Sequence, residues 1–256
     1  MEQLHLWFAL ALGALGLLVG SFLNVVAIRV LKKESIVFPP SHCVHCRHRL
    51  RAYDLVPVVS YLALRGRCRD CRGRISPVYP VGEAATAALY AWVGWHYGPL
   101  DLEWVAGLLL VSILVVITHT DLKSMLIPDA VVFPALGLAV LLRAFLHPQP
   151  LWSYAAAAAA GFGLLYALAV VSKGGMGGGD IKLYLFIGAL CGLQATFLSL
   201  FAASALGAAY GIAVRGLGRL QPKQAIPFGP FIAVGAFLSF LYGEAWVDGY
   251  IRWMMS

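Results

Sequence analysis

Residues 4–28 read LHLWFALALGALGLLVGSFLNVVAI, a run without Asp, Glu, Lys or Arg. A helix of about 20 apolar residues crosses the hydrocarbon core of a bilayer, so this run is long enough to span it. No small-residue cleavage site followed by a polar region ends the run. We therefore interpret it as a retained transmembrane helix rather than a signal peptide.

The rest of the chain shares this apolar character. Of its 256 residues, 61% are hydrophobic and 12% are charged, whereas soluble domains have about one quarter charged residues. That leaves too little polar surface to cover a soluble globule, and indicates a polytopic membrane protein. Apolar runs predict an all-α fold with about eight transmembrane helices, at 5–30, 81–98, 103–119, 130–147, 152–172, 182–194, 196–215 and 226–243.

Two boundaries in this scheme are soft. A break near Gly192 divides one long apolar run into two short helices, and the tail 246–255 could lie along the membrane surface. The alanine run 155–160, followed by Gly161 and Gly163, offers a small-residue face for close helix packing. No internal repeat is evident along the chain.

Positive charge is concentrated in one loop. The net charge is +7, and 11 of the 19 Lys and Arg residues fall between Arg29 and Arg74. Such loops stay in the cytoplasm, so we expect the N-terminus outside and reject the inverted topology. The segments expected inside are 31–80, 120–129, 173–181 and 216–225. This charge also attracts anionic lipid headgroups. Because no recognised nucleic-acid-binding fold accompanies it, we expect the lipid bilayer as a partner and no nucleic acid.

The same loop contains two Cys-x-x-Cys pairs, in HCVHCRHRL (42–50) and RGRCRDCRGRI (65–75). Two such turns can complete a closed tetrahedral S4 site for a structural Zn²⁺, and disulfides are disfavoured in the reducing cytosol. The predicted ligands are Cys43, Cys46, Cys68 and Cys71. A redox role and unliganded thiols are the alternatives. The loop histidines could replace a cysteine, but we interpret them as solvated: His42, His45 and His48. Cys191 is expected in a helix core.

Two carboxylates are candidates for catalysis. Asp121 follows the apolar run VSILVVITHT (111–120), and Asp180 ends the glycine-rich stretch GGMGGGD (174–180). Ionisable groups in spanning segments are costly and therefore functional candidates. In the expected topology both lie at cytoplasmic helix ends. Two close carboxylates share one proton, so one can activate water while the other donates a proton, which suits peptide hydrolysis.

The glycines have two interpretations. Without side chains, Gly177, Gly178 and Gly179 let a substrate strand approach the carboxylate closely. Alternatively, the stretch is a flexible hinge and Asp180 an interfacial helix cap. The same capping role is open for Asp121 and for Asp129.

Six ordered motifs make the chain resemble the type IV prepilin peptidases, leader peptidases and N-methyltransferases of the GxGD aspartyl protease class. The resemblance covers almost the whole length. Its motifs are GSFLNVVAIR (20–29), the tetracysteine loop (39–76), YPVGEAATA (79–87), DLKSMLIPD (121–129), GMGGGDIKL (175–183) and IPFGPF (226–231).

The resemblance implies that Asp121 and Asp180 are the catalytic pair, whereas Asp129 shapes or caps the next helix. It implies cleavage of prepilin or pseudopilin leaders after Gly at the cytoplasmic face of the bacterial inner membrane. It also implies N-methylation of the new terminal residue, usually Phe, with S-adenosylmethionine as methyl donor. Many members have a second acidic residue where this chain has Lys123, which we expect to favour an ionised Asp121. Glu83 is a candidate for the methyltransferase site, and a structural role is its alternative.

The expected organisation has three parts. Residues 1–31 form the first transmembrane helix, 32–80 a zinc-ribbon-like cytoplasmic loop associated with methyl transfer, and 81–256 the peptidase core. Two other functions compete with this one. A small transporter or channel would use the two aspartates as an ion site, and a zinc-ribbon scaffold would need the cysteines alone. The pilus, type II secretion or competence system that is served is left open.

Overall fold

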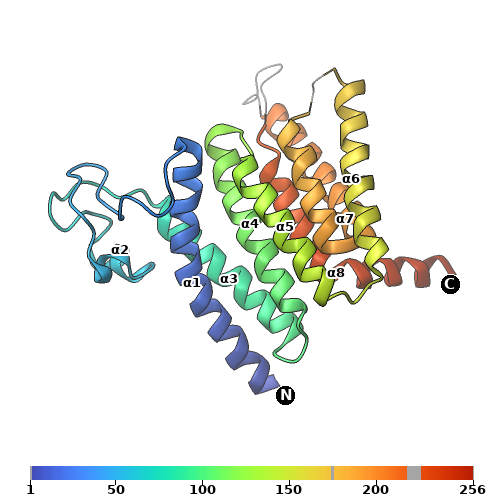
Figure 1. Ribbon diagram of the computed structural model, residues 1–256, viewed down its shortest axis with the longest axis horizontal. Helices are drawn as coiled ribbons and strands as arrows, with labels where there is room; N and C mark the ends of the chain where they lie inside the picture. Colours follow the sequence, from blue (N-terminus) through green and yellow to red (C-terminus); the bar gives the residue numbers. More distant parts are fainter. Residues whose placement is uncertain (1, 174–175, 218–225, 256) are drawn as a thin grey trace. The chain divides into compact units, whose positions relative to one another are not determined.

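The computed structural model describes residues 2–173, 176–217 and 226–255 (Figure 1). Within these ranges the chain is helical and contains no strand beyond two isolated bridges. The elements are α1 (Glu2–Lys32), η1 (Ala52–Leu55), α2 (Val59–Ala63), α3 (Val78–Tyr97), α4 (Glu103–Ser124), α5 (Asp129–Phe145), α6 (Leu151–Val171), α7 (Gly178–Gly216) and α8 (Gly229–Met255). The all-α prediction is therefore confirmed for the described chain.

The helices that qualify as membrane spans are fewer than the eight predicted. Among the described residues, five helices are long and apolar enough to cross a membrane: α1, α4, α6, α7 and α8. This supports a multi-pass membrane protein, but about eight spans are not confirmed. Helix α5 has 17 residues, and α7 contains two helical segments joined at Gly192, where φ is 78°. The predicted break at this glycine is thus present, and it divides α7 into a shorter first segment and a longer second one.

The chain divides into two compact units, Met1–Trp104 and Val105–Ser256. In the first unit α1 packs against α3 through small residues. A Cβ at Gly16 would lie 2.8 Å from the Cα of Ala87, and one at Gly20 would lie 2.9 Å from Oγ1 of Thr86. Helices in lipid have no hydrophobic driving force for association, so they associate through the close packing that small residues permit. The cysteine loop, residues 33–77, projects from the end of this helix pair (Figure 1).

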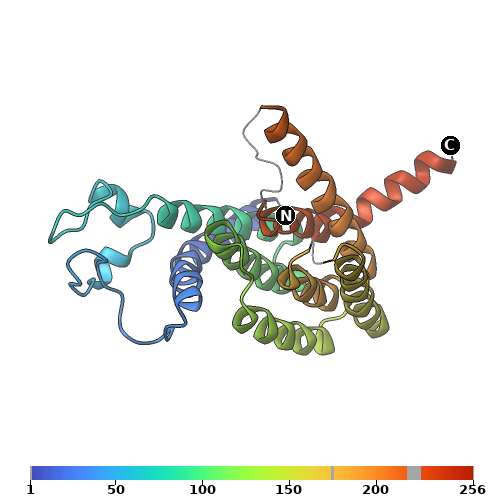
Figure 2. The ribbon, with the colours of Figure 1, turned by 90° about the horizontal axis from the view of Figure 1, so that it is seen from above.

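In the second unit α7 packs against α5, α6 and α8. A Cβ at Gly188 would lie 2.4 Å from the backbone nitrogen of Ala158, so α7 touches the alanine run of α6 directly. This confirms the close-packing face predicted for that run. The last turns of α8 continue the helix to Met255 and run away from the other helices of this unit (Figures 1 and 2).

One buried charge accompanies the kink in α7. Arg143 of α5 is buried, and its Nε donates to the carbonyl of Leu190 at 2.7 Å. Its guanidinium also donates to the carbonyl of Leu146 and lies 4.9 Å from the ring of Tyr154. A helix break frees carbonyl groups that have no intrahelical partner. Arg143 therefore satisfies backbone exposed by the kink at Gly192.

Candidate active site and cysteine cluster

Asp121 lies in the last turn of α4 and is buried. Its Oδ2 accepts a hydrogen bond from the backbone N–H of Gly229, at 2.7 Å. Gly229 is the first residue of α8. The first N–H groups of a helix have no partner within the helix, and that end has a partial positive charge. The start of α8 is therefore suited to hold a carboxylate at this position.

Position 229 requires glycine for steric reasons. A Cβ built there would lie 2.8 Å from Oδ2 of Asp121 and 2.9 Å from its Cβ. Such distances are too short for carbon, so any side chain would displace the Asp121 carboxylate. The motif IPFGPF thus places a bare backbone donor against the first aspartate, a role that the sequence analysis did not assign.

Asp180 lies in the first turn of α7 and is half-buried. Its backbone N–H donates to the carbonyl of Gly177, at 3.2 Å. Its side chain lies near enough to Asp121 for the two charges to interact. Two carboxylates from different helices therefore lie in one region of the second unit, and the sharing of one proton between them stays a prediction.

The three glycines before Asp180 have different surroundings. A Cβ at Gly179 would lie 2.7 Å from Cβ of Ile127, whereas one at Gly178 would meet nothing within 4 Å. A Cβ at Gly177 would lie 3.2 Å from Oδ2 of Asp180. Gly179 therefore allows the start of α7 to pack against the segment before α5, and Gly178 faces open space. Gly174 and Gly175 lie outside the described residues.

Asp129 pairs with a lysine that the sequence analysis did not single out. Both of its carboxylate oxygens lie 2.8 Å from Nζ of Lys182, which ties the start of α5 to the first turns of α7. Pro128 occupies the N-cap position of α5 and makes no side-chain cap. Asp129 therefore acts as an ion-pair partner at the helix start. Lys123 is exposed, and among the described residues it forms no ion pair with Asp121.

The four predicted cysteines converge on one point. The Sγ atoms of Cys43, Cys46, Cys68 and Cys71 all lie within 4.8 Å of one another, and that of Cys43 is 3.8 Å from that of Cys71. Four sulfurs at about 2.3 Å from a tetrahedral Zn²⁺ are about 3.8 Å apart. The cluster therefore fits a closed S4 zinc site.

The electrostatics of the cluster favour a thiolate at Cys43 and not at Cys46: a backbone hydrogen bond from His48 lowers the Cys46 pKa, but burial and hydrogen bonds with the other thiols raise it to about 11. Burial opposes ionisation of the Cys43 thiol, but hydrogen bonds from the backbone of Cys46 and His45 lower its pKa to about 6. Metal ions bind the thiolate rather than the thiol. Cys191 is buried in α7, as expected of a core residue.

The two halves of the cysteine loop have the same backbone pattern, offset by 25 residues. Cys43 N–H donates to the carbonyl of His48, and Cys68 N–H donates to that of Gly73. Arg47 and Arg72 both have φ of 58°. The bridges His42–Arg49 and Arg67–Arg74 correspond in the same way. The two Cys-x-x-Cys stretches thus form a short local repeat of about eight residues, which the sequence analysis noted as two motifs and not as a repeated backbone unit.

The loop histidines bond to other groups. His45 contacts the carbonyl of Arg74 at 3.2 Å, and His42 contacts that of Pro40 at 3.0 Å. His48 lies 3.9 Å from a carboxylate oxygen of Asp70. Among the described residues, the candidate metal cluster contains cysteines and no histidine.

Glu83 faces the cysteine loop from α3. It is buried, and its Oε2 accepts a hydrogen bond from the backbone N–H of Val58, at 2.7 Å. Val58 precedes α2 and has φ of 60°, a region that β-branched residues avoid. The contact therefore fixes a strained loop position, which is the structural alternative for Glu83.

Comparisons with known proteins identify relatives over nearly the whole chain. The model of the bacterial peptidase A24 N-terminal domain matches residues 14–97, and that of the type IV leader peptidase family matches residues 108–212. The prepilin leader peptidase/N-methyltransferase of Bacillus subtilis is 38% identical over 239 residues, covering 93% of this chain and 95% of the relative. The protein of the same name from Pseudomonas aeruginosa is 34% identical and covers 96% of this chain and 94% of the relative. That from Neisseria gonorrhoeae is also 34% identical and covers 97% of this chain and 96% of the relative.

The chain belongs to the type IV leader peptidase family. It is therefore an enzyme of a peptidase family, and the names of its relatives join a methyltransferase activity to the peptidase. This agrees with the resemblance seen in its motifs. No solved structure gives a significant match to the chain.

Proposed function

We propose that this enzyme removes the leader peptides of membrane-inserted prepilins or pseudopilins, after a Gly at the cytoplasmic face, with Asp121 and Asp180 as its catalytic pair. The observation that carries this proposal is that the two carboxylates, one at the end of α4 and one at the start of α7, lie near enough for their charges to interact. Acids at helix ends, in helices of spanning length, suit a peptide bond near the membrane surface.

The hydrogen bond from Gly229 supports a division of roles. A backbone donor suits a carboxylate more than a carboxylic acid, so Asp121 is the general base and Asp180 holds the shared proton. Asp121 takes a proton from a water molecule as its oxygen attacks the scissile carbonyl carbon. Asp180 donates its proton to the carbonyl oxygen. When the C–N bond breaks, the proton held by Asp121 passes to the leaving amine, and one hydroxyl proton of the tetrahedral intermediate returns to Asp180.

The glycines before Asp180 are proposed as the substrate approach. Gly177 and Gly178 are exposed, and Gly178 has open space where a side chain would stand. An extended substrate strand can therefore lie against bare backbone next to the carboxylate. Gly179 contributes indirectly, because its contact with Ile127 sets how closely the start of α7 approaches the segment after α4.

We assign the second activity, N-methylation of the new N-terminal residue, to the unit that contains the cysteine loop. S-adenosylmethionine supplies the methyl group when it is bound. Cys43, Cys46, Cys68 and Cys71 hold a structural Zn²⁺ that folds the loop. Glu83 was a candidate to contact the donor, but its bond to Val58 favours a role as the loop's anchor.

Mass spectrometry of a prepilin incubated with the purified enzyme, with and without S-adenosylmethionine, tests both activities. We expect a cut after Gly in either case and an added methyl mass when the donor is present. Asp121→Asn and Asp180→Asn should each lower cleavage by at least about a hundredfold, the scale of general acid–base catalysis. Ion flux in liposomes without any cleavage by the wild type would favour a transporter and contradict the proposal.

A further inference from the structure

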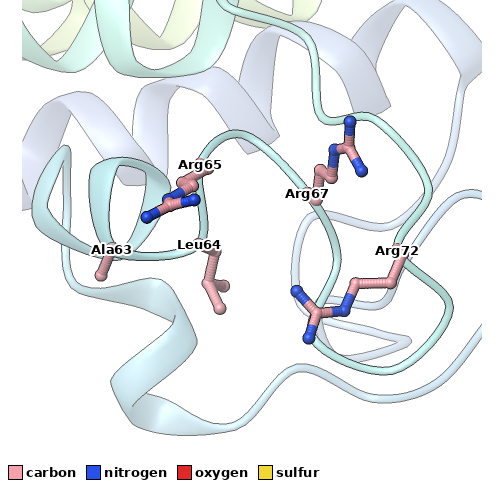
Figure 3. Close-up of a pocket in the computed structure, with 5 residues that line it drawn as sticks. All are labelled: Ala63, Leu64, Arg65, Arg67 and Arg72. Carbon is pink, nitrogen blue, oxygen red and sulfur yellow. The ribbon is translucent and has the colours of Figure 1, made fainter.

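The cysteine loop contains a hollow that neither proposed activity uses. Its volume is about 410 Å³, and it is lined by Ala63, Leu64, Arg65, Arg67 and Arg72 (Figure 3). Arg72 extends its guanidinium across the hollow toward Leu64, Arg65 lies beside Leu64, and Arg67 lies at the upper edge with its guanidinium turned away from the hollow. We call Arg65, Arg67 and Arg72 the arginine pocket.

Among the described residues, no carboxylate neutralises the positive charge of the arginine pocket. Two nearby carboxylates of the loop have other partners, since Asp54 pairs with Arg69 at 2.8 Å and Asp70 lies beside His48. Across the described parts of the chain, no carboxylate forms an ion pair with a member of the pocket. The thiolates of a zinc site would offset part of the charge of Arg67 and Arg72, which adjoin Cys68 and Cys71 in the sequence. Guanidinium groups that are exposed and have no carboxylate partner can bind an anion.

An exposed apolar segment leads directly into the pocket. Val59 and Leu62 of α2 are 61% and 67% exposed, and Leu55 and Val56 just before them are also exposed. Val59 and Leu62 are three residues apart within α2, so they share one side of its turn. Exposed aliphatic side chains next to arginines are typical of segments that lie in the membrane interface.

We propose that the arginine pocket binds the phosphate of an anionic phospholipid while the side chains of Leu55, Val56, Val59 and Leu62 enter the same leaflet. The loop is tethered close to the membrane, because its ends continue into the helices α1 and α3, and α1 is long enough to span. A cationic peptide would be repelled by the pocket, so charge complementarity favours the lipid.

The test measures hydrogen–deuterium exchange of residues 52–67 in the full-length enzyme, held in nanodiscs of phosphatidylcholine alone or mixed with phosphatidylglycerol. The variant is Arg65→Gln/Arg67→Gln/Arg72→Gln. The matched control is Arg47→Gln/Arg49→Gln/Arg74→Gln, which removes the same charge from exposed positions of the same loop that do not line the pocket. Equal zinc content in the two variants shows that both loops remain folded.

We expect phosphatidylglycerol to slow exchange in the wild type and in the control, and to have little effect in the pocket variant. Near an anionic surface each arginine strengthens binding to the membrane by about five-fold. Equal responses of the two variants would show that the loop interacts with the lipid through its overall charge and not through the pocket, and would overturn the proposal. Slowed exchange in phosphatidylcholine nanodiscs on adding inorganic phosphate or S-adenosylmethionine, with no response to phosphatidylglycerol, would assign the pocket to a soluble ligand and also overturn it.

Discussion

At the residue scale, the contact between Gly229 and Asp121 defines the geometry of the candidate site. The amide of Gly229 is a donor that no side chain could replace, because any Cβ at this position would collide with the carboxylate. The sequence identified Asp121 and Asp180 through the cost of placing acids beside lipid. It did not identify Gly229, because a pairing across more than a hundred residues leaves no local pattern.

Gly229→Ala should lower peptide cleavage by about a hundredfold, because it moves the Asp121 carboxylate from its place. Gly249→Ala is the matched control, since Gly249 lies in the same helix and a Cβ there would meet nothing within 4 Å. Steady-state cleavage of a prepilin by both variants, at equal amounts of folded enzyme, makes the comparison. Equal rates for the two variants would contradict the importance of the Gly229 contact.

Glu83→Ala should impair methylation more than peptide cleavage, because it leaves Val58 without its hydrogen-bond acceptor and loosens the loop. Glu83→Gln keeps a carbonyl acceptor at nearly the same position. If Glu83 anchors the loop, the glutamine variant should retain most of the methylation that the alanine variant loses. A glutamine variant as inactive as the alanine variant would favour direct contact with the methyl donor instead.

At the element scale, the cysteine loop depends on its metal. Paired replacement of Cys43 and Cys46 by Ser should release zinc and impair methylation more than cleavage, because the two proposed activities lie in different units. Metal analysis together with the two activity assays checks this. Unchanged methylation in a metal-free variant would separate the loop from methyl transfer.

The pair between Asp129 and Lys182 should matter less. Both side chains are more than a third exposed, and exposed ion pairs contribute about 0–1 kcal/mol. Lys182→Met should therefore change the melting temperature and the cleavage rate little. A loss of cleavage comparable to that of Asp180→Asn would show that the pair positions α7 for catalysis.

Some elements were predictable and others were not. The Cys-x-x-Cys spacing fixed the cluster, because two such turns bring four sulfurs together whatever surrounds them. Gly192 was visible as a break in an apolar run, and the kink is present. The burial of Arg143 depends on carbonyls freed by a different helix, which periodicity cannot reveal. Apolar runs predicted about eight spans, whereas the lengths and hydropathies of the described helices support five, because such runs indicate helices without fixing their lengths.

At the scale of the whole molecule, the distribution of charge predicts how the chain is inserted. The turn after α3 should face the outside and the segment after α4 the cytoplasm. A cysteine at Leu100 should react with an impermeant maleimide in intact cells, whereas one at Met125 should react only after permeabilisation. Both side chains are exposed, so accessibility within the protein does not explain a difference. The reverse pattern would invert the topology and move both aspartates to the outer face.

The central claim is that two carboxylates, Asp121 and Asp180, hydrolyse the leader peptide bond. Mass spectrometry of one purified prepilin with the wild type, Asp121→Asn and Asp180→Asn, each checked for folding and zinc content, tests this most directly. The account predicts a cut after Gly by the wild type and almost none by either variant. It also predicts that both variants still methylate a prepilin supplied already cleaved. Full cleavage by either variant would contradict the aspartate-pair mechanism.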